Sequence, residues 1–127
     1  MSNIPEVLKY SKDHEWVRLD GDKAYVGITD HAQSELGEIV YVELPSVGDT
    51  FSKNEEIATV ESVKAASAII NPLAGEVMAV NEDLDDSPEL INTDCYKHYL
   101  YVLGGFESSD YDALLDASAY AEFLESL

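Results

Sequence analysis

The segment from Glu56 to Ile70 predicts a β-hairpin that carries a single lysine, Lys64, at its tip. Residues 56–60 are rich in β-branched side chains, and residues 68–70 have the same character before the turn signal Asn71-Pro72. Small residues lie between the two strands. This pattern restricts the chain to folds in which a short hairpin presents one amine to solvent.

Lys64 is the only cation between Lys53 and Lys97. An exposed turn lysine with small neighbours suits an enzyme that must hold the amine and acylate it, whereas the alternative is an ordinary solvated lysine. The surroundings favour the first interpretation. The residues expected to form the attachment hairpin around Lys64 are Glu61, Ser62, Val63, Ala65 and Ser67.

Further short elements lie on the amino-terminal side of this hairpin. Strands 15–19 and 24–28 flank the turn signal Asp20-Gly21-Asp22. Thr29 is expected to cap a helix over 30–36 that ends at Gly37, and a strand is expected over 39–44.

Two similar strand–turn units enclose the hairpin, one at 40–49 and one at 75–83. Such an arrangement predicts two small antiparallel sheets folded over each other, because closing short strands into a flattened barrel protects their edges. The fold class predicted is therefore mainly β, a barrel-sandwich hybrid with short helices and a carboxyl-terminal helix.

In the second half, Ser87 is expected to cap one helical turn that begins at Pro88, and 96–103 is expected to form a strand. The tail repeats apolar residues at helical spacing from Ser109, with a possible break at 116–118. We predict one domain over 1–127, with a core at about 15–104 and a helical segment at about 109–126.

The net charge of −19 excludes the usual electrostatic basis for binding nucleic acid or anionic membranes. Residues 65–127 contain one cation, Lys97, so the surface would instead attract proteins with basic docking surfaces. The alternative is a charge that serves only solubility.

A single cysteine, Cys95, fits a reducing compartment, and residues 1–6 carry no signal pattern. We expect a bacterial cytoplasmic protein.

Conventional catalytic arrangements find little support in the sequence. No glycine-rich phosphate loop precedes a helix, and the three histidines lack close metal-ligand spacing. Cys95 and His98 would point to opposite faces of a strand. Two other classes stay open, a hydrolase that uses His31 with Glu15 and a structural acidic adaptor. A carrier needs less machinery, because a prosthetic group supplies the chemistry.

The stretch from Glu61 to Ser67 resembles the lipoyl-attachment sequence of the glycine cleavage system H-protein family. The resemblance covers most of residues 9–92 and continues into the tail. Its other segments, in order, are 10–16, 27–33, 37–45, 71–77 and 87–92, followed by 114–120. The chain departs from the family pattern at Cys95, at Tyr99 in place of a tryptophan and at Val102 in place of a lysine. These departures put the last strand's surface in doubt.

The resemblance implies a lipoylated carrier that is not itself an enzyme. Lys64 would hold lipoate in amide linkage. The family's partners are a pyridoxal-phosphate-dependent glycine decarboxylase, an aminomethyltransferase and a dihydrolipoyl dehydrogenase, with a lipoate ligase or a lipoyl or octanoyl transferase for attachment. The carrier takes the aminomethyl group of glycine from the first partner to the second and is then reoxidised by the third.

Two questions stay open beside this interpretation. The chain could be a lipoyl or biotinyl carrier domain of another multi-subunit enzyme, or a lipoyl relay protein, although Val63 and Ala65 replace the methionines typical of biotin sites. The loaded arm would also gain from a polar shelter beside the hairpin. Glu15 and His31 are the candidates for its lining, with helix 30–36 as one wall.

Overall fold

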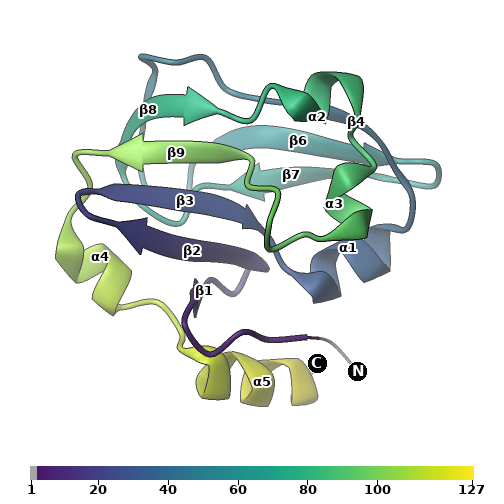
Figure 1. Ribbon diagram of the computed structural model, residues 1–127. Helices are drawn as coiled ribbons and strands as arrows, with labels where there is room; N and C mark the ends of the chain where they lie inside the picture. Colours follow the sequence, from purple (N-terminus) through teal and green to yellow (C-terminus); the bar gives the residue numbers. More distant parts are fainter. Residues whose placement is uncertain (1–2) are drawn as a thin grey trace.

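The computed structural model describes residues 3–127, in which two antiparallel sheets pack against each other (Figure 1). The larger sheet has the order β1-β2-β3-β9-β8-β5, and the smaller has the order β4-β6-β7. The strands are β1 (Lys9–Tyr10), β2 (Glu15–Asp20), β3 (Lys23–Ile28), β4 (Ile39–Glu43), β5 (Thr50–Phe51), β6 (Glu56–Ser62), β7 (Ala66–Ile70), β8 (Gly75–Val80) and β9 (Tyr101–Gly104).

This arrangement confirms the predicted fold class. The two strand–turn units that enclose the hairpin lie in opposite sheets, since β4 pairs with β6 and β8 pairs with β9. Apolar side chains from both sheets meet in one core, where Val26, Val60, Val77 and Leu103 are fully buried. Burying each such side chain contributes about 1.5–3 kcal/mol.

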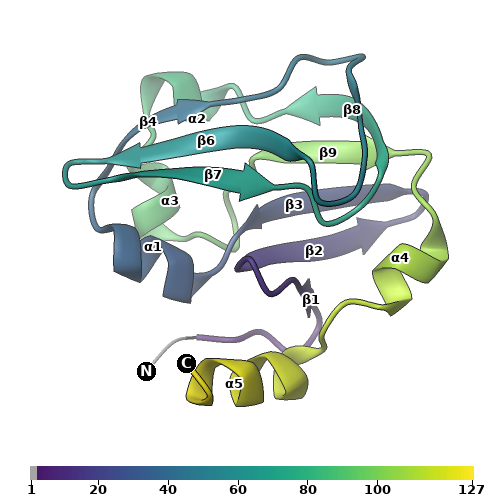
Figure 2. The ribbon, with the colours of Figure 1, turned by 180° about the vertical axis from the view of Figure 1, so that it is seen from behind.

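Helix α1 (Asp30–Leu36) forms where its caps predict it. The Thr29 hydroxyl accepts a hydrogen bond from the Ala32 amide at 3.3 Å, and Gly37 ends the helix with φ +83°. The helix lies beside the tip of the β6–β7 hairpin, which extends past the other strands (Figure 2). The caps therefore place a helix next to the candidate lysine.

The carboxyl-terminal segment forms two helices, α4 (Ser108–Asp112) and α5 (Ala117–Glu125). The helix is interrupted, as predicted, but at 113–116 rather than at 116–118, because Asp116 caps the start of α5. Asp116 caps α5 by accepting from the Ala119 amide. Tyr120 stacks on Tyr10 with ring centroids 4.7 Å apart, and the backbone of Tyr10 pairs with that of Leu115. These contacts hold α5 beneath β1 (Figure 1).

Two expectations in the second half were wrong. Ser87 does not cap a helix at its start, because it ends the short helix α2 (Asp83–Asp86), and its amide donates to the Asp83 carbonyl. Helix α3 (Leu90–Thr93) begins later than predicted. The strand predicted over 96–103 is confined to β9, since the amides of Lys97 and His98 donate to the Asp94 carbonyl and close a turn.

Candidate functional site

Lys64 lies at the tip of the β6–β7 hairpin, as the sequence predicts. Glu61 pairs with Ala66, so residues 62–65 form the turn. Lys64 and Ala65 are exposed, and Val63 keeps 69% of its surface. The amine is therefore presented among small or exposed neighbours.

Ser62 organises the turn from beneath and is only 8% exposed. Its hydroxyl oxygen accepts hydrogen bonds from the amides of Lys64 at 3.3 Å and Ala65 at 3.1 Å. Its backbone amide donates to the Ala65 carbonyl at 2.7 Å. This one small hydroxyl residue thus satisfies backbone groups that the tight turn leaves unpaired.

The loop between α1 and β4 contacts the tip from the side. The Val63 amide donates to the Glu38 carbonyl at 3.1 Å. The Cε atom of Lys64 lies 3.6 Å from the point where a Cβ on Gly37 would stand. The lysine stem therefore lies across a glycine, toward α1.

A cavity of about 210 Å³ lies between α1 and the hairpin strand β7. Its lining is mixed, with carboxylates, imidazoles and apolar groups, and comprises Asp13, His14, Ile28, His31, Ala32, Glu35, Leu36, Ser67, Ala68 and Ile69. The structure thus places His31 and Ser67 at this cavity and makes α1 one of its walls. It is lined by the strand that leads away from Lys64.

The imidazoles of His14 and His31 lie side by side at the cavity, with ring centroids 4.6 Å apart. Burial lowers the pKa of His14 below its usual 6.5, and the neighbouring His31 lowers it further. His14 Nδ1 lies 2.8 Å from the Tyr120 hydroxyl, and His31 Nε2 lies 3.9 Å from a Glu35 carboxylate oxygen. The ring pair therefore joins the cavity to helix α5.

Glu15 is 1% exposed and is not among the residues that line the cavity. Burial raises the pKa of its carboxyl from 4.5 to about 8, although a hydrogen bond from Ser11 lowers it. The Ser11 hydroxyl donates to this carboxyl at 2.6 Å. At neutral pH the Glu15 carboxyl is thus mainly protonated and uncharged.

Sequence reasoning missed His14, Asp13 and Glu35 as cavity residues. The spacing of His31 and Glu35 by one helical turn could have indicated a shared face. His14 adopts φ +68°, a left-handed conformation that a non-glycine residue rarely takes, and this had no sequence signal.

Other candidate sites gain no support. Cys95 is buried, and burial raises the pKa of its thiol to about 12, so it is no ready nucleophile. Val102 is buried in β9, and Tyr99 packs edge-on against Tyr25.

Within residues 3–127, no three metal-binding side chains gather closely enough to hold an ion. None of the helices described has the length and apolar character of a membrane span.

Comparisons with known proteins agree on one family. Residues 8–127 match the family described as Glycine cleavage H-protein. The glycine cleavage system H protein of Enterobacter sp. (strain 638) is 52% identical over 128 residues, covering 99% of each chain. That of Psychrobacter sp. (strain PRwf-1) is 55% identical over 122 residues, covering 94% of this chain and 97% of the relative. The crystal structure of a glycine cleavage system H protein from Mycobacterium marinum superposes with a TM-score of 0.86 at 38% identity, covering 98% of this chain and all of that one.

Proposed function

The chain belongs to the glycine cleavage H-protein family, and on that premise we propose that Lys64 is the residue that carries lipoate in amide linkage. The family is lipoate-bearing, and its members are carrier subunits of glycine cleavage. The observation that carries the proposal is the exposed lysine on a turn of small residues held by Ser62.

The residues present fit the group. A modifying enzyme needs a free amine with neighbours that do not obstruct it, and Ala65 and Ala66 are exposed beside Lys64. Lipoate, when attached, supplies a reactive dithiolane on a long flexible arm. The contribution of this chain is to hold the lysine outward, to offer a cavity beside β7 and to present an acidic surface. No catalytic group is required of it, so we propose a non-catalytic carrier formed by one domain.

The partners follow from the role. They are the glycine decarboxylase, the aminomethyltransferase, the dihydrolipoyl dehydrogenase and the enzyme that attaches lipoate. A carrier that visits several enzymes in turn needs short-lived complexes, and complementary charge speeds association more than it tightens binding. The net charge of −19 supports the proposal that these partners have basic docking surfaces.

The free Cys95 supports a cytoplasmic location.

The proposal is tested by intact mass and peptide mapping of the protein from its native host. One lipoyl amide is expected on Lys64 and none in Lys64→Arg. An adduct on another residue, or unmodified protein from cells that lipoylate other carriers, would contradict it.

We further propose that the cavity between α1 and β7 shelters the loaded arm. His31 lines this cavity, and Glu15 lies buried nearby, since a backbone hydrogen bond from Ile70 on β7 contributes to its pKa. In the aminomethyl-loaded protein without the transferase, His31→Ala and Glu15→Ala should each raise ammonia release while leaving lipoylation intact. An unchanged rate in both variants would place the shelter elsewhere.

A further inference from the structure

Beyond the pairing of β4 with β6, one backbone hydrogen bond joins the tip that carries Lys64 to the loop Gly37–Glu38. The bonds made by Ser62 lie within the turn and set its shape. The bond from the Val63 amide to the Glu38 carbonyl instead joins the turn to the loop. The position of the lysine relative to α1 therefore depends on how firmly this loop is held.

Asn92, at the end of α3, holds the loop on both sides of Glu38. Its side-chain oxygen accepts from the Ile39 amide at 2.8 Å. Its side-chain nitrogen donates to the Gly37 carbonyl at 2.8 Å and to the Gln33 side-chain oxygen at 2.9 Å. A primary amide has two N–H donors and a carbonyl acceptor, so the three bonds use both kinds of group that asparagine offers.

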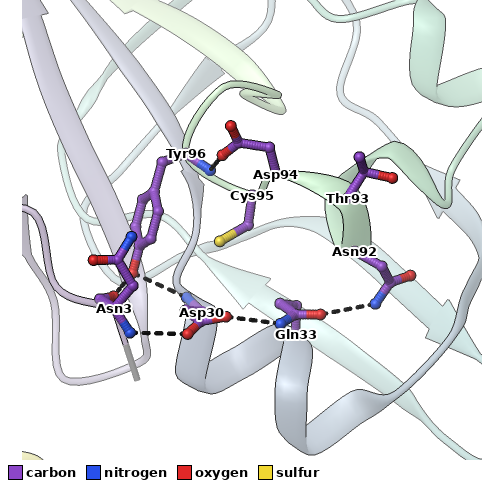
Figure 3. A pocket seen from close by; sticks show the side chains of 8 residues that line it. All are labelled: Asn3, Asp30, Gln33, Asn92, Thr93, Asp94, Cys95 and Tyr96. Atoms are coloured by element: carbon purple, nitrogen blue, oxygen red, sulfur yellow. Dashed lines mark hydrogen bonds between the residues drawn. The ribbon is translucent and has the colours of Figure 1, made fainter. Parts of the chain in front are cut away.

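The same network reaches the wall of the cavity. Gln33 lies on α1 and donates in turn to the Asp30 carboxylate at 2.8 Å. Figure 3 shows this line of polar side chains from Asn92 through Gln33 to Asp30. They line a pocket that also includes Tyr96 and that is separate from the cavity between α1 and β7. Asn92 thus bonds both the helix that lines the cavity and the loop that holds the lysine tip.

We propose that Asn92 is a positioning residue that fixes the Lys64 tip relative to helix α1. The inference rests on the proposed function of Lys64. Without the amide of Asn92, the Gly37 and Ile39 backbone groups lose their partners, and the Glu38 carbonyl loses the frame that aims it at Val63. The tip then samples other orientations, and the modifying enzyme meets the productive one less often.

The test uses Asn92→Asp in the full-length, unmodified protein. The carboxylate can still accept from Ile39, but it turns an oxygen toward the Gly37 carbonyl and the Gln33 oxygen. Amide hydrogen exchange of Val63 should accelerate about tenfold, because the Glu38 carbonyl that accepts from this amide is no longer held in place. The Ser62 amide, whose bond lies within the turn, should change much less.

The second readout is lipoylation by a purified lipoate ligase. We expect kcat/KM for Asn92→Asp to fall about three- to tenfold, mainly through KM, since the amine itself is unchanged. If Asn92→Asp folds poorly, Asn92→Ala replaces it. Asn92 is only half-buried, and it lies at a surface pocket that Glu38, Glu89 and Thr93 also line. Water can therefore reach the Gly37 and Ile39 backbone groups that the alanine leaves without a partner.

The matched control is Asn81→Asp. Asn81 is 8% exposed, and its amide donates to the Tyr99 carbonyl at 2.9 Å, so the variant disturbs a similar bond outside the hairpin. It should lower stability without changing Val63 exchange relative to Ser62, or kcat/KM.

Equal acceleration at Ser62 and Val63, an unchanged Val63 amide, or the same fall in kcat/KM for Asn81→Asp would overturn the inference. Failure of the wild-type protein to accept lipoate at Lys64 would overturn the proposed function instead. The exchange comparison would still test Asn92 in that case.

Discussion

Replacing Glu15 by glutamine should make the protein more stable at alkaline pH relative to the wild type. Glu15 is 1% exposed, and burial raises the pKa of its carboxyl from 4.5 to about 8. Between these values the folded state holds a proton that the unfolded state has lost. Stability from this group is therefore fully present below about pH 4.5 and is lost as the pH rises through about 8.

The size of the effect follows from the shift. One pKa unit corresponds to about 1.4 kcal/mol, so the whole interval amounts to at most about 5 kcal/mol. Between pH 5.5 and 8.5 the wild type should lose about 3 kcal/mol from this group, whereas the neutral amide in Glu15→Gln loses nothing. Ser11 can still donate to the amide oxygen, as it does to the carboxyl.

The assay is urea unfolding of both proteins at pH 5.5, 7 and 8.5. With a slope of about 1.5 kcal/mol per molar urea, a change of about 3 kcal/mol moves the relative midpoint by about 2 M. His14 contributes with the opposite sign, since its lowered pKa removes stability as the pH falls below 6.5. Subtracting the two proteins cancels most of that contribution.

Glu43→Gln, on the exposed face of the small sheet, controls for the loss of one charge from an acidic protein. A difference between wild type and Glu15→Gln that stays constant within about 0.5 kcal/mol from pH 5.5 to 8.5 would refute the reasoning. It would mean that the carboxyl ionises in the folded protein as it does in the unfolded chain.

Three further predictions concern the hairpin and the surface. Inserting one residue between Ile57 and Val60 should invert the strand faces and sharply lower lipoylation by a purified ligase, and modification at the wild-type rate would show that tip geometry does not matter. Gly37→Ala should lower the free energy of unfolding, measured in urea, by about 1–3 kcal/mol, because φ +83° and ψ −150° suit glycine alone. A decrease below about 0.5 kcal/mol would contradict this. The rate at which the protein associates with any of the proposed partners that has a basic docking surface should fall about tenfold or more between low and physiological salt in stopped-flow measurements. A rate that does not depend on salt would exclude charge steering.

The elements that the sequence predicted are those specified by neighbouring residues. The hairpin around Lys64 follows from alternating strand residues and a small-residue turn, and helix α1 follows from Thr29 and Gly37 at its ends. Each of these signals acts over a few residues. Local preference and final structure agree there, so a single sequence suffices.

The features that escaped prediction depend on distant partners. The expected strand over 96–103 is shortened because its first part turns back, with the Tyr96 hydroxyl accepting from the Asp30 amide. The bonds of Asn92 reach residues 53 to 59 positions away in the chain. No local pattern marks an asparagine that will hold a remote loop, nor the left-handed His14 at the cavity.

The raised pKa of Glu15 also bears on how a cationic arm would be held in the cavity. At pH 7 a carboxyl with a pKa of about 8 is about nine-tenths protonated, so it meets an amine as a neutral group. Glu15 does not line the cavity, but a cation held there would favour its anion and release the proton, which would strengthen docking as the pH rises from about 6 to about 8. The exposed carboxylates of Asp13 and Glu35 line the cavity directly and offer the other route. If Glu15 receives the amine, Glu15→Gln should weaken protection of the loaded arm and abolish this pH dependence of ammonia release. If the lining carboxylates do, Glu15→Gln should leave the release rate unchanged, whereas Glu35→Gln should raise it.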